Sequence, residues 1–112
     1  MNQISNSFKH ISKHIEPNSR VLDLGCGTGS LLDMLKKKKN IQGYGIEIQF
    51  NHILSCIEKG ISVFQTDINE GLAEISDNAY DYVILSQTIQ QVKNPKLVLS
   101  EMLRVGKQGI VL

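Results

Sequence analysis

The segment VLDLGCGTGSL at residues 21–31 is the feature that most constrains the fold. A short apolar run ends in glycine, and glycines then recur at every second position as Gly25, Gly27 and Gly29. Glycine tolerates left-handed backbone and lets other groups approach the main chain closely. We expect Gly25 to turn the chain, Gly27 to leave room for a ligand, and Gly29 to let a helix pack close to the strand. The segment therefore predicts a ligand-binding loop at the carboxyl end of a buried strand.

Short apolar strands alternate with helical patterns along the rest of the chain. This alternation is typical of βαβ units, in which helices cover both faces of a parallel sheet. Right-handed crossovers then favour the doubly wound strand order 3-2-1-4-5. We therefore predict one α/β domain over residues 1–112, a Rossmann-like three-layer αβα fold. Its strands are expected at residues 20–25, 43–48, 61–67, 80–86 and 109–112.

Four helices are predicted from apolar residues three and four positions apart and from residues that favour helix ends. Ser30 with Asp33 predicts a capping box, and Asn51 predicts the N-cap of the next helix. Asn94 before Pro95 predicts the start of the last helix, and Gly106 its end. The predicted apolar faces are Ile4, Phe8, Ile11 and Ile15; Leu31, Leu32, Met34 and Leu35; Ile53, Leu54, Cys56 and Ile57; and Leu97, Val98, Met102 and Val105.

Charge and cysteine content argue against several classes of function. The net charge is +1, and the basic block at residues 36–39 has no interleaved aromatic residues, so nucleic-acid binding is not expected. Cys26 and Cys56 are too few for a disulfide scaffold and lack the spacing of metal ligands. No apolar run approaches the ~18 residues that a membrane span requires. We expect a protein of the reducing cytoplasm that binds no metal, nucleic acid or membrane.

Acidic residues at the ends of three predicted strands indicate which ligand the loop binds. Ser30 stands where the dinucleotide fingerprint G-x-G-x-x-G has its third glycine. Asp23 is unfavourable beside a pyrophosphate but favourable beside a cationic ammonium or sulfonium. Glu47 can accept hydrogen bonds from ribose hydroxyls, and Asp67 from an adenine amino group. The three carboxylates together predict a site for a positively charged nucleoside.

Longer stretches of the sequence resemble a known family. VLDLGCGTG, YGIEI and FQTDINEG resemble the cofactor-binding half of the class I S-adenosylmethionine-dependent methyltransferases. GYGIEI, ISVFQTDINEGL, DNAYDYVILSQTIQQV and EMLRVGKQGIV together resemble the methionine biosynthesis MetW family, and the match includes the unusual LSQTIQQV. The resemblance implies a methyltransferase-like fold and a role in methionine synthesis, with the homoserine O-acyltransferase MetX as a protein partner.

The resemblance also implies the ligand, S-adenosylmethionine or S-adenosylhomocysteine, and the residues that bind it. The glycine loop and its neighbours would lie along the methionine part. Glu47 would hold the ribose, Asp67 and the Ile68 backbone would meet the adenine, and Ser86 would lie near the methionine or acceptor end. The predicted cofactor-binding residues are Asp23, Gly25, Cys26, Gly27, Glu47, Ile48, Asp67, Ile68 and Ser86.

Catalytic residues are not identified by the sequence. His10 and His14 are expected on the surface of the first helix, and His52 is expected far from the methyl group. Gln87, Gln90 and Gln91 follow the fourth strand, and glutamine side chains bind but do not take protons. Cys26 is interpreted as a small residue filling the loop rather than as a nucleophile.

Three functions therefore remain open on the sequence. The first is a methyltransferase acting on a small molecule. The second is a non-catalytic protein that binds the nucleoside and regulates the acyltransferase. The third is a nicotinamide-dependent oxidoreductase, against which Asp23 and the position of Gly29 argue.

The sequence stops within the fifth predicted strand. Class I domains usually continue with further strands, so we expect a piece of a longer protein, truncated before the last strands. Residues 110–112 would then form an uncovered apolar edge, which favours pairing with another strand. A homodimer through this edge is the expected assembly.

Overall fold

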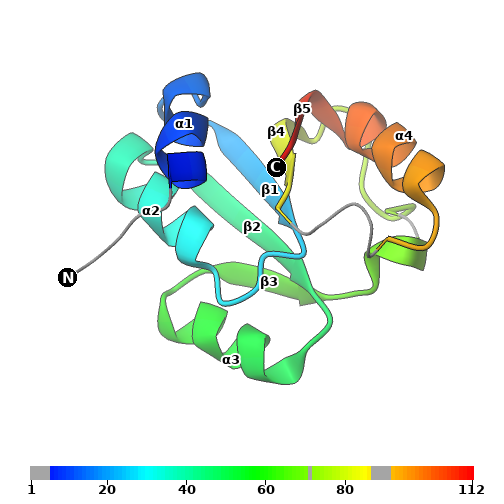
Figure 1. The fold of residues 1–112 in the computed structure, drawn as a ribbon, viewed down its shortest axis with the longest axis horizontal. Helices are drawn as coiled ribbons and strands as arrows, with labels where there is room; N and C mark the ends of the chain where they lie inside the picture. The colour runs from blue at the N-terminus through cyan, green and yellow to red at the C-terminus, as the bar shows by residue number, and fades with distance from the viewer. Residues whose placement is uncertain (1–5, 71, 87–91) are drawn as a thin grey trace.

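A computed structural model describes residues 6–70, 72–86 and 92–112. Its centre is a sheet of five parallel strands in the order β3-β2-β1-β4-β5 (Figure 1). The predicted strand order is therefore confirmed, with β1 in the middle. The strands are β1 (Arg20–Leu24), β2 (Gln42–Glu47), β3 (Ser62–Gln65), β4 (Tyr80–Leu85) and β5 (Gly106–Val111).

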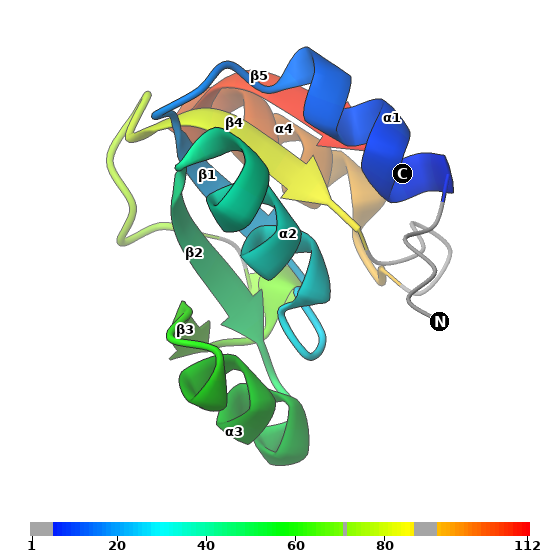
Figure 2. The ribbon, with the colours of Figure 1, turned by 90° about the vertical axis from the view of Figure 1, so that its left-hand side faces the viewer.

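Helices cover both faces of the sheet, as Figure 2 shows with α2 in front of it and α4 behind. Alternate side chains of β1 enter different apolar clusters, because successive residues of a strand point to opposite faces. Val21 packs with residues of α1, α2 and α3, whereas Leu22 and Leu24 pack with residues of α4. The helices are α1 (Asn6–His14), α2 (Ser30–Lys39), α3 (Phe50–Glu58) and α4 (Pro95–Val105), and a short 3-10 helix spans Ile68–Glu70.

Two predicted helix starts are wrong. The N-cap of α2 is Gly29, at φ 85°, and no side chain caps this end. Ser30 is already the first helical residue, and Asp33 forms an ion pair with Lys37 at 3.1 Å. The N-cap of α3 is Gln49, so Asn51 lies inside the helix. The chain enters α2 from the left-handed backbone of Gly29, and it enters α3 from Gln49, whose N–H donates to Glu47, so the two helices begin one and two residues earlier than the predicted caps.

The last helix follows the sequence prediction closely. Asn94 Oδ1 accepts a hydrogen bond from Leu97 N at 3.2 Å, and Pro95 opens the helix. The helix ends at Gly106, as predicted, but this residue also begins β5. β5 is therefore three residues longer at its start than predicted.

The buried faces of the other helices agree with the sequence in part. Ile11, Ile15 and all four predicted residues of α2 are buried, whereas Ile4 lies outside the described residues. On α3, Ile53 and Cys56 are buried, but Leu54 and Ile57 are 44% and 60% exposed. Their inward placement was predicted wrongly, because α3 contacts the sheet along a narrower stripe than its apolar pattern suggests.

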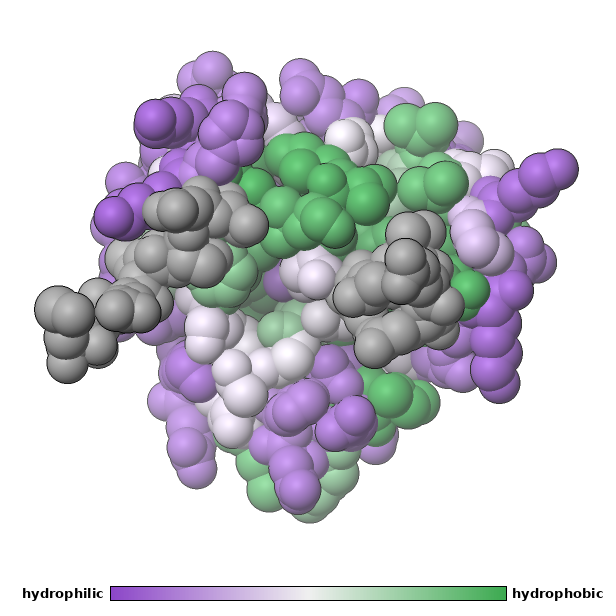
Figure 3. Space-filling view, in the orientation of Figure 1, coloured by the Kyte–Doolittle hydropathy of each residue, from purple (hydrophilic) through white to green (hydrophobic). Residues whose placement is uncertain are grey.

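Apolar surface remains at the β5 edge of the sheet. Ile110 is half-buried, while Val111 and Leu112 are exposed. Figure 3 shows an apolar area between the ends of α1 and α4 where β5 lies. In the part of the chain that the structure describes, no helix is long and apolar enough to cross a membrane.

Substituting a strand glycine tests the tight packing of β2 against the glycine loop. A Cβ at Gly45 would collide with Sγ of Cys26. We expect Gly45→Ala to lower the free energy of unfolding by about 1–3 kcal/mol, the usual cost of overpacking a core. Gly109→Ala is the matched control, because its Cβ would come no closer than 3.6 Å, to Cε of Met102. Urea denaturation measures the stability of both variants. An equal loss of stability in Gly45→Ala and Gly109→Ala would contradict the tight packing at Gly45.

Candidate functional site

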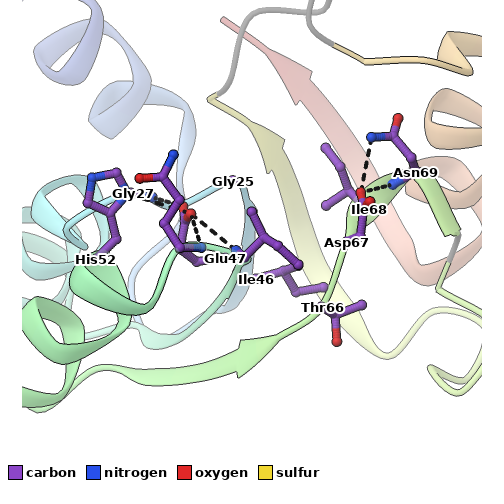
Figure 4. A pocket seen from close by; sticks show the side chains of 11 residues that line it. Gly25, Gly27, Ile46, Glu47, His52, Thr66, Asp67, Ile68 and Asn69 are labelled. Carbon is purple, nitrogen blue, oxygen red and sulfur yellow. Dashed lines mark hydrogen bonds and ion pairs between the residues drawn. The ribbon is translucent and has the colours of Figure 1, made fainter.

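A cavity of about 400 Å³ lies at the carboxyl ends of β1, β2 and β3, where the sequence predicts the ligand site (Figure 4). Its walls combine loop backbone, two carboxylates and apolar side chains. The lining residues are Gly25, Gly27, Ile46, Glu47, Ile48, Gln49, His52, Thr66, Asp67, Ile68 and Asn69. The structure thus brings six of the nine predicted cofactor residues to one cavity: Gly25, Gly27, Glu47, Ile48, Asp67 and Ile68.

The glycine loop is held against β2 by backbone hydrogen bonds. The N–H groups of Gly25 and Cys26 both donate to the carbonyl oxygen of Ile46, at 2.8 and 3.0 Å. Gly25 and Gly27 have φ values of 70° and 57°, a region that residues with a Cβ rarely adopt. A Cβ at Gly27 would have no atom within 4 Å. The expected turn at Gly25 and the expected free space at Gly27 are both present.

Gly29 has a different role from the one predicted. A Cβ at this position, with φ at 85°, would lie 3.1 Å from Sγ of Cys56, so the close approach is to α3 and not to a strand. Lys59, the C-cap of α3, holds the loop at a second point, because its Nζ donates to the carbonyl oxygen of Thr28 at 2.9 Å. The loop is therefore packed between β2 and α3.

Glu47 joins the end of β2 to the glycine loop. Its carboxylate is 7% exposed and accepts three backbone hydrogen bonds. Gly27 N donates to Oε1 at 2.9 Å, while Ile48 N and Gln49 N donate to Oε2 at 3.1 and 2.9 Å. Because each carboxylate oxygen can accept about two hydrogen bonds, Oε1 keeps one acceptor position for a ligand.

His52 is a cavity residue that the sequence analysis did not place there. It lies on the first turn of α3, and its Nδ1 is 3.5 Å from Oε2 of Glu47. This nitrogen is buried and has no hydrogen-bond partner in the described structure. Its position in the sequence could have indicated this. His52 follows Glu47 by five residues, which places it in the first turn of the next helix, close to the end of β2.

Asp67 lies across the cavity from Glu47, just after β3. Its Oδ1 accepts from the backbone N and from Nδ2 of Asn69, at 2.9 and 3.0 Å, so Asn69 fixes the orientation of the carboxylate. Ile68 is 8% exposed and Ile48 is 55% exposed. The cavity therefore has an acid at each end of a partly apolar wall.

Asp23 and Ser86 lie beneath the loop and do not line the cavity. The Asp23 side chain has no exposed surface, and Ser86 Oγ lies 2.6 Å from its Oδ1. Burial raises the pKa of Asp23 from 3.8 to about 7. Hydrogen bonds from the side chain and backbone of Ser86 oppose this rise in pKa, and the nearby charge of Glu47 adds to it. The buried surroundings of Asp23 therefore disfavour its charged form.

The two cysteines fill space between the loop and α3. Cys26 and Cys56 are both buried, with their sulfur atoms 3.7 Å apart. Burial raises the pKa of both thiols, so the protonated form dominates near neutral pH. This agrees with the prediction that Cys26 is a packing residue, and a thiol in this state is a poor nucleophile.

His10 and His14 do not line the cavity. The rings of His10 and His14 pack edge-on at 5.0 Å between centroids on the exposed side of α1. Gln87, Gln90 and Gln91 lie outside the described residues. Within the described residues, no group of three or more His, Cys, Asp or Glu side chains could hold a metal ion.

Comparison with known proteins identifies the family. The model of the methionine biosynthesis protein MetW matches residues 5–112. The chain belongs to the MetW family. It is 39% identical over 105 residues to the bifunctional methionine biosynthesis protein MetXA/MetW of Rhodopirellula baltica, a match that covers 87% of this chain and 17% of that protein. MetW therefore occurs in a relative as part of one polypeptide with MetXA.

The chain also has more distant similarities to methyltransferases, which indicate its fold. The chain is 31% identical over 98 residues to the ubiquinone biosynthesis O-methyltransferase of Hahella chejuensis, covering 83% of this chain and 41% of that protein. It is also similar to the structure of a SAM-dependent methyltransferase, possible histamine N-methyltransferase, from Thermotoga maritima. That match has a TM-score of 0.71 and 26% identity and covers 89% and 45% of the two chains. The fold is that of class I methyltransferases, and the chain spans less than half the length of these relatives.

The burial of Asp23 predicts that the stability of the protein depends on pH. Below about pH 3 this carboxyl is protonated in both the folded and the unfolded chain. As the pH rises to about 7, the unfolded chain loses the proton first, so the folded state loses stability by about 1.4 kcal/mol for each pH unit. Asp23→Asn removes this loss, and we expect the native protein to lose more stability than the variant between pH 5 and pH 8.

Urea denaturation at several pH values provides the measurement. Asp81→Asn is the matched control, because the pKa of Asp81 is lowered by a hydrogen bond from the backbone of Arg20. Asp81 is thus ionised in both states above pH 5, and its removal leaves the slope unchanged. If the free energy of unfolding changed with pH in the same way for the native protein and Asp23→Asn, Asp23 would be ionised in the folded chain at pH 5, which contradicts the prediction.

Proposed function

We propose that the cavity binds S-adenosylmethionine or S-adenosylhomocysteine. The observation that carries the proposal is that Glu47 and Asp67, from the ends of two neighbouring strands, line one cavity with the glycine loop. None of the lining residues in the described part of the chain is a lysine or arginine. A pyrophosphate would therefore lack cationic partners here, whereas a cationic nucleoside would lie in a favourable field. This supports an adenosine sulfonium ligand over a dinucleotide.

The residues of the cavity fit such a ligand in the proposed orientation. The free acceptor position on Oε1 of Glu47 suits a ribose hydroxyl, and Asp67 suits the adenine amino group. The exposed side chain of Ile48 and the buried Ile68 supply apolar contacts for the base. The open space at Gly27 leaves the loop backbone accessible to the rest of the ligand.

We propose that the protein is a methyltransferase of methionine biosynthesis that acts on a small molecule. The bound nucleoside supplies an activated methyl group, so the chain mainly has to bind and align the reactants. Glu47 orders the loop, and Asp67 with its partner Asn69 fixes the adenine end. Family membership supports the pathway, and the name of the Hahella relative, an O-methyltransferase of ubiquinone biosynthesis, supports a small acceptor.

A second candidate is a non-catalytic partner of a homoserine O-acyltransferase. The observation that favours it is the Rhodopirellula baltica protein, in which MetXA and MetW share one chain. In this case the nucleoside would act as an effector, and its differential affinity for two states of the complex would change the acyltransferase rate.

Substitution of Glu47 tests the ligand site. We expect Glu47→Ala to weaken S-adenosylmethionine binding by about 1–3 kcal/mol, because the ribose loses its charged acceptor and the loop loses a backbone partner. Isothermal titration calorimetry measures the effect, with circular dichroism to confirm folding. Glu58→Ala is the matched control, since Glu58 is exposed on the same helix as His52 and does not line the cavity. NAD should not bind, and tighter binding of NAD than of either nucleoside would contradict the proposal.

A methyl-transfer assay separates the two candidate functions. The full-length protein is incubated with labelled S-adenosylmethionine and candidate small acceptors, with and without the acyltransferase. Transfer of label supports the enzyme. A change in acyltransferase rate with the nucleoside, and no transfer of label, supports the regulatory function.

We also propose that two copies of this chain pair through β5. The support is the exposed apolar edge formed by Val111 and Leu112, at the outer strand of the sheet. Unpaired strand edges of this kind are sites of association. Light scattering of the 112-residue chain should give a dimer mass, and a monomer at all concentrations would contradict this assembly.

A further inference from the structure

Asp23 has an unsatisfied oxygen in the interior of the protein. Its side chain is fully buried, and Oδ2 has no hydrogen-bond partner in the described structure. A buried carboxylate oxygen without a donor is costly, and a carboxyl group avoids much of this cost by keeping its proton. The geometry of this residue therefore suits the neutral form better than the charged form.

Ser86 connects Asp23 to the cavity wall. Its Oγ lies 2.6 Å from Oδ1 of Asp23 and 3.2 Å from the carbonyl oxygen of Gly25, which is a cavity residue. A hydroxyl group has one proton, so it can donate to only one of these oxygens at a time. When Asp23 is protonated it can donate to Ser86, which then donates to Gly25, and both contacts are satisfied. When Asp23 is ionised, Ser86 donates to the carboxylate and the Gly25 carbonyl loses its partner.

The titratable groups around Asp23 also favour the proton. Glu47 at the end of β2 is the charged group that acts on it, and its negative charge raises the pKa of Asp23. The thiols of Cys26 on the loop and Cys56 on α3 are protonated and bring no positive charge. Among the described residues, no positively charged group is found to act on Asp23, so within this part of the chain a cation near Asp23 has to come with the ligand.

We propose that Asp23 carries a proton in the ligand-free protein and that a cationic nucleoside in the cavity displaces it. This inference rests on the proposed function. An ammonium group that donates to the Gly25 carbonyl frees the proton of Ser86, which turns to Oδ1 of Asp23. The positive charge of the ligand stabilises the carboxylate, and the proton of Asp23 passes to the buffer. Binding and proton release are then one event, and affinity rises with pH.

Calorimetry in two buffers of different ionisation enthalpy measures the released protons directly. With S-adenosylmethionine we expect proton release that is largest below the raised pKa of Asp23, of about 7, and that decreases as the pH rises above it. Adenosine, which carries no ammonium or sulfonium, should bind without release from Asp23. Equal release with the two ligands would overturn the coupling to ligand charge.

Two variants separate Asp23 from other sources of protons. Asp23→Asn cannot release this proton. The number of protons that this variant releases on binding therefore gives the contribution of the ligand itself and of all other groups. Ser86→Ala keeps the carboxyl but removes a hydrogen bond that lowers its pKa, so the release profile should move to higher pH. Circular dichroism confirms that both variants are folded.

The outcomes distinguish this inference from the proposed function. Binding of S-adenosylmethionine with equal proton release by the native protein and Asp23→Asn overturns the role of Asp23 and leaves the proposed function intact. A Ser86→Ala profile at unchanged or lower pH overturns the coupling through Ser86. Failure of folded native protein to bind either nucleoside overturns the proposed function, and this inference falls with it.

Discussion

The hydrogen bonds of one carboxylate hold the candidate site together. Glu47 accepts from the backbone of Gly27 in the loop after β1 and from Ile48 and Gln49 at the entrance to α3. Two separate parts of the chain are therefore positioned by a side chain that is itself fixed at the end of a buried strand. The loop conformation, the start of α3 and the position of His52 all depend on this group. A carboxylate bonded to several backbone N–H groups is among the stronger polar contacts in proteins.

Much of the fold and of the site follows from sequence patterns that act locally. Apolar strands alternate with helices, and parallel strands with right-handed crossovers allow few orders of the sheet. Once the order is known, residues after neighbouring strands must meet at one edge. Glu47 and Asp67 were predicted to share a cavity for this reason, and they do. The roles of Gly25 and Gly27 were predictable because glycine readily adopts positive φ values and leaves free space beside the backbone.

The parts that the sequence did not predict depend on contacts between distant segments. The start of α3 is set by hydrogen bonds to Glu47 and not by a side-chain cap at Asn51, so the cap pattern was misleading. His52 lines the cavity because α3 begins early and turns its first residues toward β2. Asp23 was expected along the ligand, but it is fully buried beneath the loop. The spacing of residues in the sequence does not indicate how deep below the surface a side chain lies.

The contact between α3 and the loop has a mechanical consequence. Gly29 packs against Cys56 of α3, and Lys59, directly after the helix, donates a hydrogen bond to Thr28, so this helix and its end support the loop. The outer surface of the same helix exposes Leu54 and Ile57 to the surroundings. A force applied to that outer surface would travel across a single helix diameter to reach the candidate cavity.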